Sequence, residues 1–203
     1  MKKLLYVGVL FGMFALTACE KKSETNEEEP VQEAPSVSVE NNQIAANGVV
    51  ANLTTWGASY AVEVNSGKPF LELYIHDGNF GDAFHFGIKT VPSASKTLKW
   101  QEGDNFPGNV TDSEFFADVK VNDETWYGGF TSDGYGVDGG EMDVTISGDK
   151  ITFTMKEVEL GDSYLNHQIT KRVKCVAQVT MSKSELEVAL DGGRSVGGSL
   201  MAK

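Results

Sequence analysis

The chain has 203 residues, 40% of them hydrophobic, and carries 29 acidic against 17 basic side chains, which gives a formal net charge of −12 at pH 7. A chain this acidic repels nucleic-acid phosphates and anionic lipid head groups, and it has no stripe of lysine and arginine with which to bind them. The composition therefore argues against nucleic acid as a partner, and the length suits a single domain behind terminal segments.

The first eighteen residues have the layout of a secretory signal peptide. Lys2 and Lys3 precede an uncharged apolar run over residues 4–16, and small residues follow it. A run of about a dozen residues is too short to span a bilayer, which takes roughly 20 apolar residues in a helix. The pattern predicts export and the removal of residues 1–18.

The segment closes with Leu16-Thr17-Ala18-Cys19, which resembles the lipobox of bacterial lipoproteins. The resemblance covers residues 1–19 only. It implies cleavage between Ala18 and Cys19, diacylglycerol on the Cys19 sulfur, and often acylation of the new amino group with a fatty acid such as palmitate. It also implies a lipid-anchored protein of the cell envelope, in the outer membrane if the host is Gram-negative, because Glu20 is not the aspartate associated with inner-membrane retention. The alternative is an ordinary signal peptide cut after Ala18.

Residues 20–42 form an acidic segment without aromatic residues, which contains seven acidic and two basic side chains. Such a segment buries too little apolar surface to offset its ordering entropy, and its like charges and two prolines favour an extended chain. We expect residues 19–42 to be a lipidated cysteine and a disordered tether, followed by one domain over residues 43–203.

The domain follows a two-residue period, most clearly in two segments that flank the turn Gly148-Asp149. This dipeptide suits a two-residue hairpin loop. Joining the segments through it places three apolar pairs on one face: Ile146 with Ile151, Val144 with Phe153, and Met142 with Met155. A chance register rarely matches every apolar residue in this way, so the pattern predicts a β-hairpin.

Similar alternation recurs in further stretches, whose apolar residues share one face: Leu71 to Ile75, Phe84 to Ile88, Phe115 to Val121, and Ile169 to Met181. A change of phase at Lys156-Glu157 predicts a β-bulge, and Lys183–Leu190 could form only one or two helical turns. Many short strands with Gly- and Asp-rich turns predict an all-β domain, either an antiparallel β-sandwich or a barrel. The glycines of residues 192–198 predict a flexible C-terminal tail.

The sequence offers little support for an enzyme. Cys175 falls on the apolar face of its predicted strand, which favours a small buried side chain over a nucleophile. Residues 193–197 spell Gly-x-Ser-x-Gly, but they lack the strand and helix that a nucleophile elbow requires. We therefore expect no catalytic residue and no cofactor, while an enzyme remains an alternative.

Two loops, residues 77–82 and 132–140, contain enough aspartate to raise the question of calcium. Neither has an oxygen ligand at each of positions 1, 3 and 5, because Gly81 and Tyr135 interrupt the pattern. Tight turns use the same residues for backbone reasons, so calcium stays an open alternative. The histidines His76, His85 and His167 have no metal-ligand spacing, and we expect solvated surface histidines.

Aromatic residues on the outward strand faces provide the remaining candidate site. Phe70 and Phe116 are predicted to lie there, and exposed rings can stack on sugars or anchor a protein. We name four residues as a candidate binding surface: Tyr74, His76, His85 and Tyr127. The sequence favours a non-catalytic envelope module that binds a protein or glycan. The alternatives are a carrier with an apolar barrel cavity and a metal-dependent hydrolase that uses loop acids.

Replacing Cys19 with Ala should leave an uncleaved or mislocalised precursor, because the replacement removes the attachment point of the lipid. Each buried methylene contributes about 0.8 kcal/mol, so two acyl chains hold a protein stably on a bilayer. Membrane recovery and detergent partitioning of the Cys19→Ala variant measure the effect. Recovery equal to that of the unaltered protein would refute lipidation.

Overall fold

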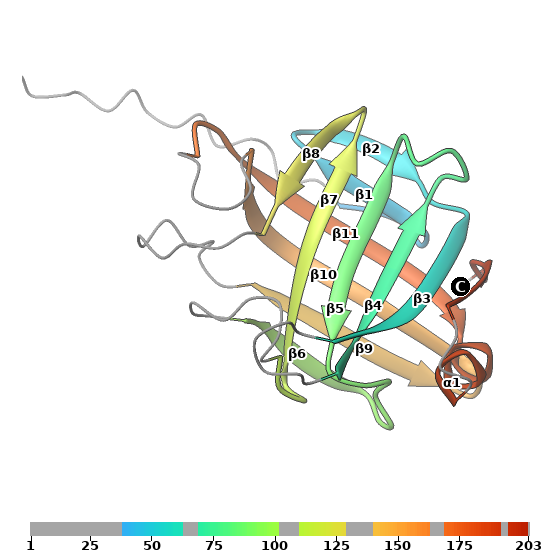
Figure 1. The fold of residues 1–203 in the computed structure, drawn as a ribbon. Coiled ribbons are helices and arrows are strands. Elements are labelled where there is room, and N and C mark those ends of the chain that lie inside the picture. The colour runs from blue at the N-terminus through green and yellow to red at the C-terminus, as the bar shows by residue number, and fades with distance from the viewer. Residues whose placement is uncertain are drawn as a thin grey trace, which may run out of the picture. The chain divides into compact units, whose positions relative to one another are not determined.

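The computed structural model describes residues 38–62, 69–101, 110–128, 140–162, 169–191 and 195–202. Within these ranges the protein is built from twelve β-strands and one helix (Figure 1). The all-β class expected from the alternating pattern is confirmed. None of the helical structure in these ranges is long and apolar enough to cross a membrane.

The strands of the first half are at most eight residues long. They are β1 (Gln43–Ala46), β2 (Val49–Asn52), β3 (Thr55–Val62), β4 (Pro69–His76), β5 (Ala83–Ile88) and β6 (Lys96–Trp100). The second half contains the two longest strands and the helix. Its elements are β7 (Glu114–Val121), β8 (Glu124–Tyr127), β9 (Glu141–Ser147), β10 (Lys150–Gly161), β11 (Arg172–Ser182), α1 (Lys183–Asp191) and β12 (Val196–Ser199).

Hydrogen bonds join the strands into one sheet in the order β12-β3-β4-β5-β7-β6-β9-β10-β11-β1-β2. Strand β8 lies off this path and pairs with both β7 and β10, so that β6, β7, β8, β10 and β9 close into a five-stranded barrel. All described pairings are antiparallel except that of β6 with β7. Figure 1 shows β3, β4, β5, β7 and β8 side by side in one layer, in front of β9, β10 and β11.

The hairpin of β9 and β10 has the predicted register. Ser147 pairs with Lys150 across the turn, and the three apolar pairs face one another: Ile146 with Ile151, Val144 with Phe153, and Met142 with Met155. Gly148 adopts a φ of 60°, which glycine accommodates without strain. The predicted bulge is also confirmed, because the register of β10 against β11 shifts between Met155 and Val158.

The core lies between the two layers and is filled by large side chains. The ring centroid of Phe86 lies 4.9 Å from that of Phe84 and 4.9 Å from that of Phe153 in the opposite layer. Cys175 is fully buried among these residues, and its burial raises the pKa of the thiol. The expectation that Cys175 is a buried apolar side chain is therefore confirmed.

The expectation of a flexible C-terminal tail is wrong for the part that the structure describes. Strand β12 pairs with β3, and beyond it the amides of Leu200 and Met201 donate to the carbonyl oxygens of Thr54 and Thr180. The glycines permit close packing here: a Cβ at Gly197 would lie only 2.6 Å from the carbonyl oxygen of Trp56. Residues 192–194 lie outside the described ranges.

The folded part begins before Gln43. The side-chain amides of Asn41 and Asn42 both donate to the carbonyl oxygen of Met201, at 3.0 and 2.8 Å. Thr180, which the alternation of Ile169 to Met181 puts on the polar face of its strand, is 1% exposed because its hydroxyl donates to Asn41 and also contacts the hydroxyl of Thr152. The predicted tether therefore ends before Asn41, and residues 1–37, with the signal peptide and Cys19, lie outside the described ranges.

Truncating Phe153 to Ala should lower the free energy of unfolding by about 3–5 kcal/mol, the range for a large aromatic deletion in a core. Thr145, which is exposed on the same hairpin, is the matched control. The Thr145→Ala variant should change the free energy of unfolding by less than about 0.5 kcal/mol. Urea unfolding at constant slope compares the two variants. Equal destabilisation would show that the faces are assigned wrongly.

Candidate functional site

Four strands of the front layer place one side chain each in a continuous row on the outer face. The sheet register aligns Tyr74 of β4, His85 of β5, Asp118 of β7 and Tyr127 of β8. Each of them alternates along its strand with side chains that fill the core, so burial of those neighbours turns the row outward. We call this row, together with Glu72 of β4, the outer-face site.

His85 is held between two aromatic rings. Its imidazole stacks on the ring of Tyr74 with a centroid distance of 4.2 Å and an interplanar angle of 8°. The ring of Phe116 meets it edge-on at 5.8 Å and 77°. These contacts hide most of the imidazole, so the expectation that His85 is a solvated surface histidine is wrong.

Two carboxylates flank the imidazole. Nδ1 of His85 lies 3.4 Å from Oδ2 of Asp118, and Nε2 lies 3.7 Å from Oε1 of Glu72. The second distance is too long for a hydrogen bond, and within the described ranges the buried Nε2 has no hydrogen-bond partner. The carboxylates are themselves held: Asp118 accepts from the amide of Gly128 at 3.0 Å, and Glu72 accepts from the hydroxyl of Tyr74 at 3.2 Å.

These contacts set the protonation states of the site. Burial alone would lower the pKa of His85, but the hydrogen bond to Asp118 and the charges of Asp118 and Glu72 outweigh burial and raise the pKa from 6.5 to about 9. Burial and the neighbouring charge of Glu72 raise the pKa of Tyr74 to about 12. At neutral pH the site therefore contains an imidazolium stacked on a neutral phenol, which is a favourable cation–π arrangement.

A small second core lies beside the row. Phe70 and Phe116 occupy the outer face as predicted, but both are buried, because they pack against each other, Val110 and Ala61. The ring of Phe116 lies directly over Gly87: a Cβ there would come within 2.0 Å of it. Phe70 and Phe116 therefore pack beside the site on the same face and are not part of its exposed surface.

The other candidate residues lie in different places. Tyr127 is half-buried at the end of the row, opposite Asp118. His76 stacks on Phe80 at 3.9 Å instead, and its Nδ1 accepts from the amide of Gly78. The two histidines are thus engaged separately, and among the residues that the structure describes no three metal-ligating side chains of His, Cys, Asp or Glu form a group.

The aspartate side chains of the loop after β4 accept hydrogen bonds from backbone amides. Asp77 accepts from the amide of Asn79 at 2.8 Å, and this hydrogen bond is the main reason that its pKa is lowered. Asp82 accepts from the amide of Asn122 at 2.7 Å. These hydrogen bonds hold the turns in place, and they account for the aspartates of this loop without a bound calcium ion. Most of the second loop, residues 132–139, lies outside the described ranges.

Comparison with known proteins adds no relative: no family model matches this chain, and no similar curated protein or solved structure was found. The chemistry of the outer-face site must therefore be inferred from its own groups. Sequence reasoning named Tyr74, His85 and Tyr127 but missed Glu72 and Asp118. Their position on the polar face of alternating strands was visible, whereas the pairing that brings Asp118 beside His85 was not.

The protonated form of His85 should make stability depend on pH. Because its pKa is raised in the folded state, the stabilisation is complete below the unfolded value of 6.5 and is lost as pH rises through about 9. At about 1.4 kcal/mol for each pKa unit, the free energy of unfolding should fall by about 3 kcal/mol from about pH 6 to about pH 9.5. Urea unfolding at both pH values measures this loss, and His85→Gln should abolish most of it. An unchanged pH dependence in His85→Gln would contradict the assignment.

Proposed function

We propose that this protein is a lipid-anchored protein of the cell envelope whose β domain is a non-catalytic module that binds a protein partner through the outer-face site. The lipid anchor rests on the resemblance of Leu16–Cys19 to a lipobox. The observation that carries the binding role is the half-exposed ring of Tyr74, set on a partly buried imidazolium between two carboxylates. For a Gram-negative host we propose the outer membrane, because Glu20 is not the aspartate associated with inner-membrane retention.

The protonation of His85 argues against acid–base catalysis at this site. A general base works best with a pKa near the ambient pH and must present a free nitrogen to the substrate. His85 is protonated at neutral pH, and both of its nitrogens face carboxylates of the same sheet. These groups hold one another in place, which suits recognition better than proton transfer.

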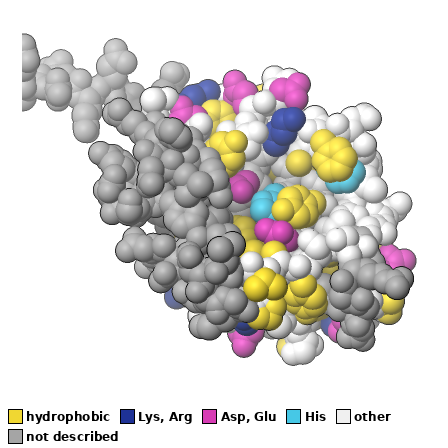
Figure 2. All heavy atoms as spheres, in the orientation of Figure 1, with side chains coloured by type: hydrophobic (Ala, Val, Ile, Leu, Met, Phe, Trp, Pro, Cys, Tyr) yellow, Lys and Arg dark blue, Asp and Glu magenta, His cyan; other side chains and the backbone are white. Residues whose placement is uncertain are grey.

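The same face has the composition of a protein-binding surface. Tyr74 and Phe80 are 43% and 60% exposed, and acidic, histidine and hydrophobic side chains gather over the front layer (Figure 2). Binding hot spots are enriched in aromatic residues set among groups that exclude water. Buried Phe70 and Phe116 give this aromatic patch a rigid support.

Charge indicates the kind of partner. Removal of residues 1–18, which contain two lysines and no acid, takes the net charge from −12 to −14. Two carboxylates against one imidazolium leave the site itself negative. A basic protein surface is therefore the complementary partner, and association should slow as ionic strength rises.

The packed interior does not favour the alternative of a small-ligand carrier. Phe84, Phe86 and Phe153 meet in the centre of the domain and are fully buried. An apolar ligand would have to displace these rings, which would create the defects that make core substitutions destabilising.

Replacing Tyr74 with Ala should abolish partner capture from envelope extracts, lowering the recovery of each specific partner by about tenfold or more, as for a hot-spot residue. Tyr60 is the matched control: it is equally exposed, at 43%, but belongs to the opposite face of β3. Quantitative mass spectrometry compares the proteins captured by the unaltered protein, by Tyr74→Ala and by Tyr60→Ala, and the Tyr60→Ala variant should capture as much as the unaltered protein. Equal recovery with both variants would refute the site, and capture of glycan alone would refute a protein partner.

A further inference from the structure

The ring of Tyr74 has different neighbours on its two sides. His85 of β5 stacks on one face of the ring at a centroid distance of 4.2 Å. On the other side of β4 lies β3, where the register sets Gly57 opposite Tyr74, and β12 in turn sets Gly197 opposite Gly57. Neither glycine has a side chain, and Gly197 is exposed. The second face of the phenol therefore stands beside bare backbone at the paired positions, in agreement with its exposure of 43%.

Small polar side chains and a carboxylate border this strip of backbone. Side chains two positions apart on a strand lie on the same face, so Thr55 and Ser59 flank Gly57 along β3. The register sets Ser59 opposite Glu72 of β4, which brings the carboxylate to the same end of the strip. We call the surface formed by the phenol ring, the two glycines and these neighbours the tyrosine shelf. Its members are Thr55, Gly57, Ser59, Glu72, Tyr74 and Gly197.

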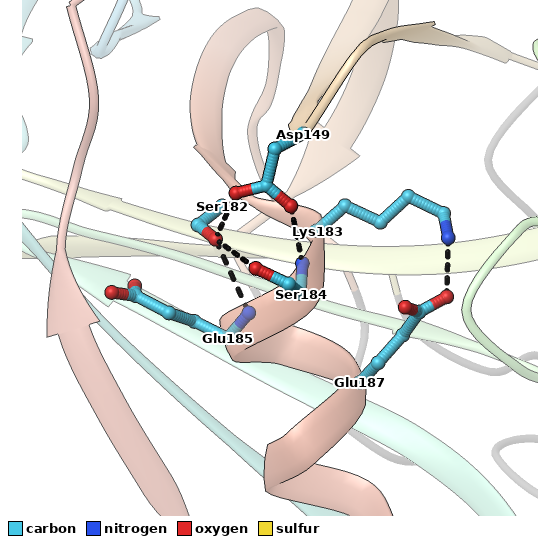
Figure 3. A network of polar contacts seen from close by, with 6 residues as sticks. All are labelled: Asp149, Ser182, Lys183, Ser184, Glu185 and Glu187. Carbon is cyan, nitrogen blue, oxygen red and sulfur yellow. Dashed lines mark hydrogen bonds and ion pairs between the residues drawn. The ribbon is translucent and has the colours of Figure 1, made fainter.

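The strands under the shelf are held in place from within the domain. Helix α1 precedes β12 in the chain and packs against β3 and β12. A hydrogen-bond network fixes its first turn (Figure 3): Asp149 accepts from the amide of Ser184 at 2.9 Å and from the hydroxyl of Ser182 at 2.7 Å. Beyond β12, the amide of Met201 donates to the carbonyl oxygen of Thr180 at 2.8 Å. A surface that is ordered before binding lowers the entropic cost of binding.

The charge of the shelf calls for a cation. Oε2 of Glu72 accepts from the hydroxyl of Tyr74 at 3.2 Å, whereas Oε1 lies 3.7 Å from Nε2 of His85, too far for a hydrogen bond. Within the described ranges Oε1 accepts no hydrogen bond, and the Glu72 side chain is 20% exposed. The carboxylates of Glu72 and Asp118 against the imidazolium of His85 leave one negative charge uncompensated. A ligand group with one positive charge complements this arrangement.

The shape of the shelf selects among cations. A guanidinium group is planar, weakly hydrated and rich in N–H donors, so it can stack on an aromatic ring while it donates to a carboxylate. The ammonium group of lysine is compact and strongly hydrated and has no flat face. Facing residues of paired strands lie about 5 Å apart, so a group stacked on Tyr74 lies directly over Gly57. A Cβ at this position would block the stack, whereas glycine permits it.

We propose that the partner of the outer-face site presents an arginine side chain to the tyrosine shelf, where its guanidinium group stacks on the second face of Tyr74 above Gly57 and donates to Oε1 of Glu72. This inference rests on the proposed binding of a basic protein and names the side chain that is recognised. Glu72 then lies beside both cations of the site, and its charge offsets the repulsion between the guanidinium group and His85.

Peptides with a single cationic residue test the shelf directly. The full-length protein, with ¹³C in its tyrosine rings, is purified in detergent and titrated with capped Gly-Arg-Gly, Gly-Lys-Gly and Gly-citrulline-Gly. The side chain of citrulline has the shape of arginine without its charge. Tyr74→Phe and Tyr60→Phe identify the two tyrosine signals to be compared. Gly-Arg-Gly should shift the Tyr74 signal saturably, with a Kd of about 1 mM, and should leave the Tyr60 signal unchanged.

The other two peptides should bind more weakly, for different reasons. Gly-Lys-Gly keeps the charge but loses the stacked plane, which should raise the Kd by about threefold or more. Gly-citrulline-Gly keeps the plane but loses the charged hydrogen bond to Glu72, which should raise the Kd by about tenfold or more. The proposal is overturned if Gly-Arg-Gly does not shift the Tyr74 signal, or if either of the other peptides binds as tightly.

Gly57→Ala and Val62→Ala form a matched pair on β3. Gly57 does not have a positive φ, so its backbone accepts alanine, whose methyl group would occupy the position under the guanidinium group. Val62 is 62% exposed on the opposite face of the strand. Gly57→Ala should raise the Kd of Gly-Arg-Gly by about tenfold or more, and Val62→Ala should leave it within about twofold. Equal binding by the two folded variants would overturn the proposal. Urea unfolding checks that both are folded, and the comparison of peptides on the unaltered protein decides if one is not.

Capture from envelope extracts separates this inference from the proposed function. Loss of the partner with both Tyr74→Ala and Gly57→Ala is the expected result. If Tyr74→Ala loses the partner and folded Gly57→Ala retains it in full, the protein partner stands and arginine recognition is refuted. If both variants retain the partner, the proposed function is refuted, and this inference with it.

Discussion

The contact between Phe86 of β5 and Phe153 of β10 joins the two layers of the domain, and the positions of the other side chains depend on it. With Phe84 and Phe86 directed inward, the intervening His85 must point outward, because side chains alternate along a strand. The same rule on β4 and β7 turns Tyr74 and Asp118 to that face. Packing of the core thus places an imidazole, a phenol and two carboxylates at neighbouring positions without any loop to position them.

That placement also determines the electrostatics of the face. An imidazole held under two rings would lose its proton if burial acted alone, but here each nitrogen lies beside a carboxylate anchored by its own hydrogen bond. The result is an aromatic patch in which one imidazolium lies between two carboxylates.

Alternation and turn chemistry were sufficient to predict the local structure, including the β9–β10 register and the bulge at Met155–Val158. The errors concern residues whose surroundings come from distant parts of the chain. His85 is covered because the ring of Phe116, which belongs to β7, fits over Gly87. Thr180 is buried because Asn41 reaches it, and the C-terminal glycines form a strand because β3 offers an edge. In each case a small or polar residue packs against a residue that is distant in sequence, and local alternation does not predict such a contact.

Asn41 and Asn42 both donate to the carbonyl of Met201, across 160 and 159 residues of sequence. These contacts join the first-made and last-made parts of the domain, so synthesis must pass Met201 before the fold can close. Loops of this length are slow to close, since chain entropy opposes them until the final contacts form. For a protein exported as we propose, this dependence favours a chain that is still unfolded, and able to pass through a translocation channel, for as long as Met201 has not been made.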